Sequence, residues 1–434
     1  MGIRTVAVFS EADRDLDYLR LADESMCIGP APLADSYLNV PSILSVAELT
    51  DAEAIHPGSS PLAESAHFAE IVATSGFQLV GPGPEVLGLI ADRARTRSAM
   101  RDVGLLCVPD NEAPLPGSPD EIVALAKNLG FPVIVKGGMG HEALASRVVH
   151  SPAALLLALN QMKAELRATF SHSPLYFEHY FANCRHIGVQ ILADGEGNAI
   201  HLGTRDCSIR HEHRELLVEA PASNIAATKL EEICCQCVDA CIALKYRGVA
   251  TFEMLYQGGR FYFLSITPKL DSAHSVTEVI TGVDIVQEQI RIATRQGLQR
   301  TQAQVKMRGH AIECHINAEH PFRFIPSTGQ IGFWLMPGGP GIRVDSHCNA
   351  NDFVPKQYPV LLGNLVAQGE TRTQTIAHMR RALAETVIEG VRTNIRLHQG
   401  IVDDDGFCGG GVHIGYLDEE LAKRYRPGTS PRGR

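Results

Sequence analysis

The order of short apolar runs and amphipathic segments is the feature of this sequence that most limits its fold. Over roughly the first 80 residues, the runs "TVAVFS", "DAEAIHPGSS" and "FQLVGP" alternate with helical patterns such as "PLAESAHFAEIVATSG". Strands that alternate with helices in this way usually pair in parallel, with helices on both faces. The beginning of the chain is therefore predicted to be an α/β domain built on a doubly wound sheet.

The middle of the chain continues with a strand that ends in lysine and with a series of β segments. A helix is expected over 84–103 and, after a linker rich in Pro and Gly, a second one that Ser118 can cap, with Glu121 completing a capping box. The strand "PVIVK" then ends at Lys136, and "LYFEHYF", "HIGVQILAD" and "NAIHLGTRD" follow. The segment "ATFEMLYQGGRFYFLSI" is predicted to be a hairpin that turns at 258–259.

The length of 434 residues is too great for one hydrophobic core, so two or three domains are expected. Hydrophobic residues at 45% and charged residues at 20% are typical of an ordinary globular protein. No apolar run approaches the roughly 18 residues of a membrane span, and "MGIRTVAVFSEADR" does not resemble a secretion signal. We expect a cytoplasmic protein without a membrane partner. The net charge of −10 also disfavours nucleic acid as a partner.

One cluster of cysteines could either pack in the core or bind a metal ion. Residues 225–245 are expected to be helical, which places Cys234, Cys237 and Cys241 on one stripe of a helix. No tight loop or nearby pair of histidines completes a tetrahedral site there. Packing in the core is therefore the preferred interpretation, and a metal site is the alternative.

The order of these segments resembles that of the ATP-grasp enzymes and, within them, the biotin carboxylase family. The similarity runs nearly end to end and includes "SYLNVPSIL", "AIHPG", "VGPGPEVLGLIADRA", "FPVIVK", "RHIGVQILADGEGNAIHLGTRDCSIR", "YRGVATFE", "VTEVITGVDIVQEQIRIA", "RGHAIECHINAE" and "EGVRTNI". The resemblance implies three domains: a pre-ATP-grasp domain over 1–82, an ATP-grasp domain over 83–307 with a lid at about 108–182, and a C-terminal domain over 308–434.

The resemblance also implies where a nucleotide would bind. Two cations hold the phosphates in the family, and Arg93 and Lys136 occupy the matching positions. The family's glycine-rich lid matches "GGMGHEALAS", but Glu142 there would repel phosphate, so a plain turn is the better interpretation of "GGMG". The positions of the adenine pocket are Glu178, His179, Phe181 and Leu255. For Glu178, an ordinary charge on a surface strand is an equally good interpretation.

The resemblance places the metal ligands of the family on the two strands of the 258–259 hairpin. The first ligand is kept as Glu253, but Ser265 and Thr267 stand where the family has a second glutamate and an asparagine. Mg²⁺ between ATP phosphates needs hard, preferably anionic oxygen ligands. We therefore expect binding of ATP and Mg²⁺ to be weak or absent.

The positions that would hold bicarbonate and biotin differ most from the family. An arginine, a glutamate base, a lysine and a second arginine of the family are replaced by Lys269, Ala273, Glu215 and His315. Alanine cannot abstract a proton, and a carboxylate at 215 would repel bicarbonate. The tyrosine and glycine after "HPG" are replaced by Ser59 and Ser60.

Some candidate site residues match the family. They are His186, His213 and Arg343. The candidates for catalysis are Lys269, His213 and Arg343, and His186 is a candidate for nucleotide binding. For the two histidines, an ordinary place in a polar cleft is an equally good interpretation.

The beginning of the family pattern is not matched. About two dozen residues, with a first strand and helix, precede the segment equivalent to "GIRTVAV" in the family. A first strand is usually central in a doubly wound sheet, so we expect a start assigned too late, a domain closed differently, or a partner that fills the gap. The usual homodimer is then open to question, and a homo- or hetero-oligomer is expected.

The leading hypothesis is a biotin carboxylase homologue without strong catalytic activity, acting as a structural or regulatory subunit. Its expected partners are an active biotin carboxylase, a biotin carboxyl carrier protein or a carboxyltransferase subunit. Two alternatives stay open: an active, ATP-dependent biotin carboxylase that uses carrier-bound biotin, and an ATP-grasp ligase with another acceptor.

Overall fold

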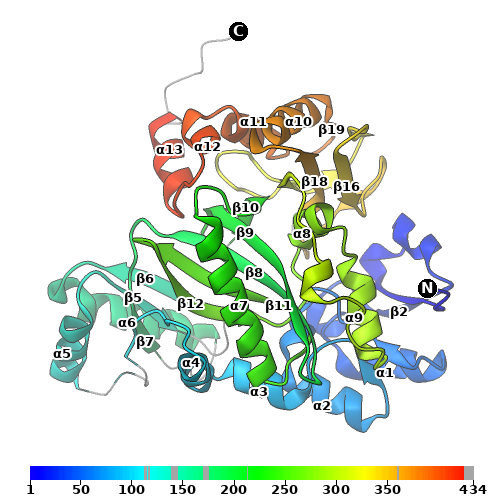
Figure 1. Cartoon of the computed structure of the whole chain (residues 1–434). Helices are drawn as coiled ribbons and strands as arrows, with labels where there is room; N and C mark the ends of the chain where they lie inside the picture. The colour runs from blue at the N-terminus through cyan, green and yellow to red at the C-terminus, as the bar shows by residue number, and fades with distance from the viewer. Residues whose placement is uncertain are drawn as a thin grey trace.

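The structure is a computed structural model, and it describes residues 1–111, 115, 118–137, 145–169, 175–212, 214–358 and 361–424. Its largest element is an antiparallel sheet with the strand order β12-β11-β8-β9-β10-β13-β18-β16 (Figure 1). The strands are β8 (Arg185–Asp194), β9 (Ala199–His211), β10 (Arg214–Ala220), β11 (Arg247–Gln257), β12 (Arg260–Thr267), β13 (His310–Asn317), β16 (Ile342–Ser346) and β18 (Leu361–Gly369). Because β10 pairs with β13, this sheet crosses the predicted boundary between residues 307 and 308.

The hairpin β11–β12 is confirmed where the sequence predicts it. Gln257 pairs with Arg260, and Gly258 and Gly259 both have positive φ angles, 58° and 77°. A two-residue turn of this kind needs φ > 0 at both central positions, which glycine adopts without steric cost. The turn sets the register as far as the pair Met254–Phe263, and a register shift between Met254 and Glu253 then places Glu253 opposite Ser265.

Two groups of helices cover the large sheet and bury its core. The helix α7 (Ala227–Ala243) packs on β8 and β9, and α10 (Arg372–Glu385) packs on β13 and β18 (Figure 1). The other helices of this half are α8 (His274–Thr281), α9 (Ile285–Ala293), α11 (Ile395–Val402), α12 (Asp405–Gly409) and α13 (Tyr416–Arg424). Cys234, Cys237 and Cys241 lie in the apolar cluster between α7 and the sheet, so the packing interpretation is confirmed.

A smaller sheet of order β6-β5-β7 lies at one end of the large sheet (Figure 1). Its elements are α5 (Pro119–Leu129), β5 (Val133–Gly137), β6 (Ala145–Val149), α6 (Pro152–Thr169) and β7 (Leu175–His179). The helix α5 starts as expected, but Ser118 makes no side-chain hydrogen bond as a cap, so the predicted capping box is wrong. This sheet places Lys136 and Glu178 on neighbouring strands that both approach the large sheet.

The N-terminal residues form parallel strand pairs covered by helices. The elements are β1 (Val6–Ser10), β2 (Glu24–Gly29), α1 (Val40–Leu49), β3 (Ala54–Ile55), α2 (Ala66–Thr74), β4 (Gln78–Leu79), α3 (Pro84–Ala91) and α4 (Arg93–Asp102). The parallel arrangement is as predicted, although β1–β2 and β3–β4 are hydrogen-bonded as two separate pairs. The single helix expected over 84–103 is wrong, because Asp92 is extended and caps α4 by accepting from the backbone N–H of Arg95.

Four short strands complete the C-terminal part of the chain. They form two antiparallel pairs, β14 (Gly329–Gln330) with β17 (Phe353–Val354) and β15 (Phe333–Leu335) with β19 (Val387–Glu389). In the part of the chain that the structure describes, no helix has the length and apolar character needed to cross a bilayer.

Candidate active site

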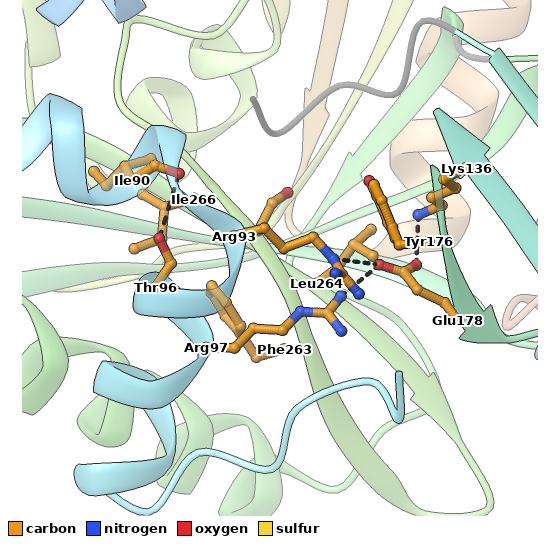
Figure 2. Close-up of a pocket in the computed structure, with 11 residues that line it drawn as sticks. Ile90, Arg93, Thr96, Arg97, Lys136, Tyr176, Glu178, Phe263, Leu264 and Ile266 are labelled. Atoms are coloured by element: carbon orange, nitrogen blue, oxygen red, sulfur yellow. Dashed lines mark hydrogen bonds and ion pairs between the residues drawn. The ribbon is translucent and has the colours of Figure 1, made fainter. Parts of the chain in front are cut away.

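One cavity of about 930 Å³ brings together most of the residues that the sequence predicts for a site. Its lining comes from the hairpin β11–β12, from the small sheet and from β8, β10 and β13. The predicted residues that line it are Ser59, Lys136, Glu178, His179, Phe181, His186, Glu215, Glu253, Leu255, Ser265, Thr267, Lys269 and His315. A second pocket of about 30 Å³ adds Arg93 and shares Lys136, Glu178 and Ser265 with it (Figure 2).

Glu178 is the centre of a buried ion cluster in this wall, and Figure 2 shows the cations converging on it. Lys136 Nζ lies 2.6 Å from Glu178 Oε2, Arg97 Nη2 lies 2.6 Å from Oε1, and Arg93 Nε lies 3.3 Å from Oε1. Burial would raise the pKa of Glu178, but the three cations outweigh it and lower the pKa from 4.5 to about 2. Glu178 is only 3% exposed, so its interpretation as a surface charge is wrong.

Asp110 is the second anion of the cluster. Arg93 and Arg97 both donate to it, and Arg101 Nη2 lies 3.8 Å from its Oδ1. The guanidinium carbon of Arg93 also lies 3.8 Å from the centre of the Tyr176 ring, where a cation is attracted to the aromatic face. Basic side chains outnumber the two carboxylates, so this end of the cavity attracts anions such as phosphate.

An apolar wall lies next to the ion cluster. The ring centroids of His179 and Phe181 are 4.9 Å apart, and those of Phe181 and Tyr262 are 4.7 Å apart. Tyr262 pairs with Leu255 across the hairpin, so these two side chains lie on the same face of it, and Leu255, His179 and Phe181 line the cavity. Flat apolar and aromatic surfaces of this kind suit the face of a planar ring.

Glu253 and Ser265 are direct partners across the hairpin, so the expected pair of metal ligands contains one carboxylate. Glu253 Oε1 accepts a hydrogen bond of 3.0 Å from Thr267 Oγ1, and its Oε2 lies 2.9 Å from His186 Nε2. Mg²⁺ prefers oxygen ligands, and a hydroxyl supplies no negative charge. The hairpin therefore offers one carboxylate to a metal ion at this position, and not the two that the resemblance implies.

Glu215 lies on β10 in the part of the cavity where the resemblance implies a lysine. Burial and the neighbouring carboxylate of Asp271 raise its pKa, against the attraction of Arg210. A raised pKa means that the surroundings of Glu215 disfavour a negative charge on its carboxyl group. The same surroundings disfavour a bound bicarbonate anion.

His315 on β13 keeps a positive charge where the resemblance implies an arginine. Its Nε2 lies 2.9 Å from Glu313 Oε1, and its Nδ1 donates to the backbone oxygen of Glu215 at 2.9 Å. Burial would lower the pKa of His315, but the hydrogen bond to Glu313 and its charge outweigh burial and raise the pKa from 6.5 to about 9. The position is thus cationic near neutral pH, and its charge is already balanced by a buried carboxylate.

Lys269 is also engaged within the protein. Its Nζ lies 2.5 Å from Oε1 of Glu64, which ends a short helical turn, Pro61–Glu64. Ser60 opens that turn by accepting a hydrogen bond from the backbone N–H of Leu62. The N-terminal part of the chain therefore contributes the anion that neutralises a candidate catalytic cation.

Ala273 occupies the position of the expected base and is fully buried. It packs in an apolar cluster that includes Val218 and Val276, directly before α8. Asp271, two residues earlier in the chain, accepts from Arg205 Nη2 at 2.8 Å and from the backbone N–H of Ala273 at 3.2 Å. No group at position 273 can remove a proton from a substrate.

Of the candidate catalytic residues that the structure describes, Arg343 is not brought to this cavity. Its Nη1 lies 2.8 Å from Glu278 Oε2 and its Nη2 lies 2.8 Å from Asp345 Oδ2. His213 and Glu142 lie outside the described residues. The role of each therefore stays a prediction.

The sequence does not reveal several residues that the structure shows to shape the site. They are Glu64, Arg97, Asp110, Arg205, Arg210, Tyr262 and Asp271. Arg205 could have been found, because an arginine in the middle of an apolar strand such as "HLGTRDCSIR" needs a buried anion. The others are ordinary charged or aromatic residues, and nothing in the sequence alone marks them as site residues.

Comparison with known domain families gives three matches along the chain. Residues 1–87 match the biotin carboxylase N-terminal domain, residues 92–301 match the ATP-binding domain of the carbamoyl-phosphate synthase L chain, and residues 313–419 match the biotin carboxylase C-terminal domain. The three matches lie in the order of the three domains that the sequence predicts.

Individual proteins show the same similarity over nearly the whole chain. Biotin carboxylase of Allochromatium vinosum is 48% identical and that of Pseudomonas aeruginosa is 46% identical, each over 97% of this chain and 94% of the relative. The crystal structure of a biotin carboxylase–β,γ-ATP complex from Campylobacter jejuni has a TM-score of 0.92 at 35% identity, covering 96% of this chain and 94% of that one. The biotin carboxylase domain of Hydrogenobacter thermophilus 2-oxoglutarate carboxylase, solved with MgADP, ADP and bicarbonate, has a TM-score of 0.91 at 34% identity, covering 97% of this chain and 93% of that one.

Proposed function

The chain belongs to the biotin carboxylase family, and we propose that it serves as a subunit of a biotin-dependent carboxylase assembly without efficient carboxylation at its own site. The fold and the ion cluster around Glu178 support a place for the chain in such an assembly. The residues at the positions of bicarbonate and biotin support the loss of carboxylation at this site. The domain limits at 82 and 307, and a cytoplasmic location, belong to the same proposal.

One observation carries this proposal. The position of the base is Ala273, which is buried in an apolar cluster and has no group that accepts a proton. The carboxylate of Glu215 lies instead at the place of an anion-binding cation, with Asp271 nearby. A site that must hold bicarbonate beside nucleotide phosphates needs positive charge there, and a carboxylate reverses the sign of that interaction.

Two further contacts support the proposal. Lys269 is neutralised by Glu64, and Glu253 faces Ser265 where two carboxylates would hold metal. The loss of one preorganised donor commonly costs about 3 kcal/mol of transition-state stabilisation. Several altered groups acting together would remove much of a typical catalytic effect of roughly 8 to 23 kcal/mol, even when their effects do not add.

A steady-state assay with free biotin, bicarbonate and MgATP tests this proposal. The biotin carboxylase of P. aeruginosa, 46% identical, is a matched active control under the same conditions. We expect turnover of this chain to be lower by a factor of about 1,000 or more, in line with the loss of more than one electrostatic group. Turnover within tenfold of the control would overturn the proposal.

The partners follow from the same proposal and need a separate experiment. We expect the chain, purified with an affinity tag from its source cells, to retain an active biotin carboxylase, a biotin carboxyl carrier protein or a carboxyltransferase subunit. Recovery of the chain alone under low salt, or only with unrelated proteins, would contradict a role in such an assembly.

An ATP-dependent ligase with a different acceptor is a second candidate, because the cations around Glu178 and the apolar wall at Phe181 are both in place. Glu215 and His315 would then contact the acceptor. Calorimetric titration with MgATP separates the candidates. Micromolar affinity favours an enzyme, whereas the absence of measurable binding favours the noncatalytic subunit.

A further inference from the structure

A second group of polar side chains lies where α7 packs against β9, and none of its three residues lines the cavity. Glu231 and Cys235 are four residues apart on this helix and both are exposed, so they lie on one face of it. His201 on β9 reaches the same place, because α7 packs across β9 (Figure 1). The possible ligand atoms of the three side chains all lie within 4.8 Å of one another.

The imidazole of His201 is buried but incompletely paired. The residue is only 3% exposed, and neither ring nitrogen has a hydrogen-bond partner among the described residues. Its Nε2 lies 3.4 Å from Glu231 Oε1, which is close but outside hydrogen-bond geometry. Leaving a buried donor or acceptor without a partner costs on the order of 1 to 3 kcal/mol, so a ligand that binds this nitrogen would be favoured.

The backbone holds His201 in a fixed position. Its strand pairs with β8, where Ile191 is the partner of His201. On the other side, the backbone N–H of His201 donates to Gln302 Oε1 at 2.9 Å, and Gln302 Nε2 donates to the backbone oxygen of His201 at 3.1 Å. The ring is thus presented by a rigid strand, while Glu231 and Cys235 are exposed and can adjust.

We propose that His201, Glu231 and Cys235 form a binding site for Zn²⁺, with water as the fourth ligand. Tetrahedral zinc bonds of about 2.0 to 2.3 Å place neighbouring ligand atoms roughly 3.3 to 3.8 Å apart. The observed separations of 3.4 Å between His201 Nε2 and Glu231 Oε1, and 3.9 Å between Cys235 Sγ and Glu231 Oε1, are close to that requirement. Cys235 is exposed, and the proposal requires its side chain to move closer to the other two ligand atoms.

The choice of zinc follows from the donor set. One imidazole nitrogen, one thiolate and one carboxylate oxygen are the ligand types that zinc accepts in proteins, whereas Mg²⁺ and Ca²⁺ prefer oxygen ligands alone. Binding converts the Cys235 thiol to a thiolate and releases one proton to solvent. The bound ion would join α7 to β9 and stabilise the large sheet beside the cavity.

Titration with Co²⁺, a spectroscopic probe for tetrahedral zinc sites, tests the proposal on the full chain without nucleotide. We expect one equivalent of Co²⁺ to bind, to give a thiolate-to-cobalt charge-transfer band, and to be displaced by Zn²⁺. Cys235→Ala should abolish the band and weaken Zn²⁺ binding at least tenfold. Cys27→Ala is the matched control, because Cys27 is also an exposed, free cysteine, and it should bind as the unmodified chain does.

Glu231→Gln provides an independent variant, which removes a second ligand without touching the buried ring. We expect it to weaken Zn²⁺ binding at least tenfold as well. All of these side chains are exposed, so equal melting temperatures in the presence of a chelator would show that the variants fold. The absence of a charge-transfer band in the unmodified chain, or its persistence in Cys235→Ala, would overturn the proposal.

Discussion

Lys136 and Glu178 form an ion pair inside the wall of the cavity, with 2.6 Å between Nζ and Oε2. The partner carboxylate oxygen faces Arg97 and Arg93, so one anion is shared by three cations. Lys136 and Arg93 are the two cations that the resemblance assigns to the phosphates of a nucleotide. Here Glu178 balances their charge within the protein, which ties β7 to β5 and to α4.

The removal of this shared anion should destabilise the protein. Glu178→Gln keeps the size of the side chain but leaves buried cations without their partner, which commonly costs about 3 to 5 kcal/mol. We expect a loss of this size in the free energy of unfolding, measured by denaturant titration at pH 7. Glu385→Gln is the matched control, because its pair with Arg381 at 3.7 Å is exposed and should contribute less than about 1 kcal/mol. A similar small effect for both variants would contradict the structural role of Glu178.

The same carboxylate should make stability depend on pH in the acid range. The folded-state pKa of Glu178 is lowered from 4.5 to about 2, so its contribution is present above pH 4.5 and is lost as the pH falls toward 2. The shift corresponds to about 3 kcal/mol. We expect the difference in unfolding free energy between the unmodified chain and Glu178→Gln to shrink between pH 5 and pH 3. A difference that stays constant over that range would show that Glu178 is not held ionised by its neighbours.

His315 should give the opposite dependence in the alkaline range. Its pKa is raised from 6.5 to about 9, so its contribution is complete below pH 6.5 and is lost as the pH rises through 9. His315→Gln should therefore be less stable than the unmodified chain at pH 6, with the difference narrowing by roughly 3 kcal/mol at pH 10. Denaturant titrations at the two pH values measure this change. NMR of the imidazole provides a direct check, and a pKa near 6.5 would refute the charged state proposed for His315.

Local patterns predicted the elements of the site well, because each depends on neighbouring residues in the chain. The turn at Gly258 and Gly259 and the pairing of Glu253 with Ser265 are both as predicted, although a register shift between Met254 and Glu253 sets that pairing. The break at Asp92 was missed, because the two helices follow each other directly. Asp92 ends α3 and also begins α4, so no loop between them marks the boundary.

The electrostatic state of the site could not be predicted in the same way. Lys269 was a free cation in the sequence, and its neutralisation depends on Glu64, which lies in a different part of the chain. His315 was counted as a lost cation, whereas Glu313 raises its pKa and keeps it charged. Both effects depend on distances between side chains that only the folded structure sets.

Gly309 should be a sensitive position for the connection between the two halves of the large sheet. It precedes β13 with a φ of 69°, and a Cβ at this residue would lie 2.3 Å from the backbone oxygen of Gly369. Gly104 is the matched control, because its φ is 84° and nothing lies within 4 Å of such a Cβ. Gly104→Ala should cost about 1 to 2 kcal/mol from the backbone conformation. Gly309→Ala should cost a further 1 to 3 kcal/mol from the contact with backbone. Equal losses of unfolding free energy for the two variants, measured by denaturant titration, would contradict a close contact between residue 309 and the backbone of Gly369.

The single carboxylate at the hairpin leads to the last prediction, which concerns metal affinity. Ser265 lies directly opposite Glu253 and lines the cavity, so Ser265→Glu would place two carboxylates face to face there. Paired carboxylates repel each other until a dication binds between them, and Mg²⁺ uses one or two carboxylates together with phosphate oxygens. We expect Ser265→Glu to bind Mn²⁺, a paramagnetic substitute for Mg²⁺, at least tenfold more tightly in the presence of ATP. Ser265→Gln has nearly the same size without the charge and should leave the affinity unchanged. Equal affinities for the two variants, measured by the loss of the free Mn²⁺ signal in electron paramagnetic resonance, would show that charge at residue 265 does not limit metal binding.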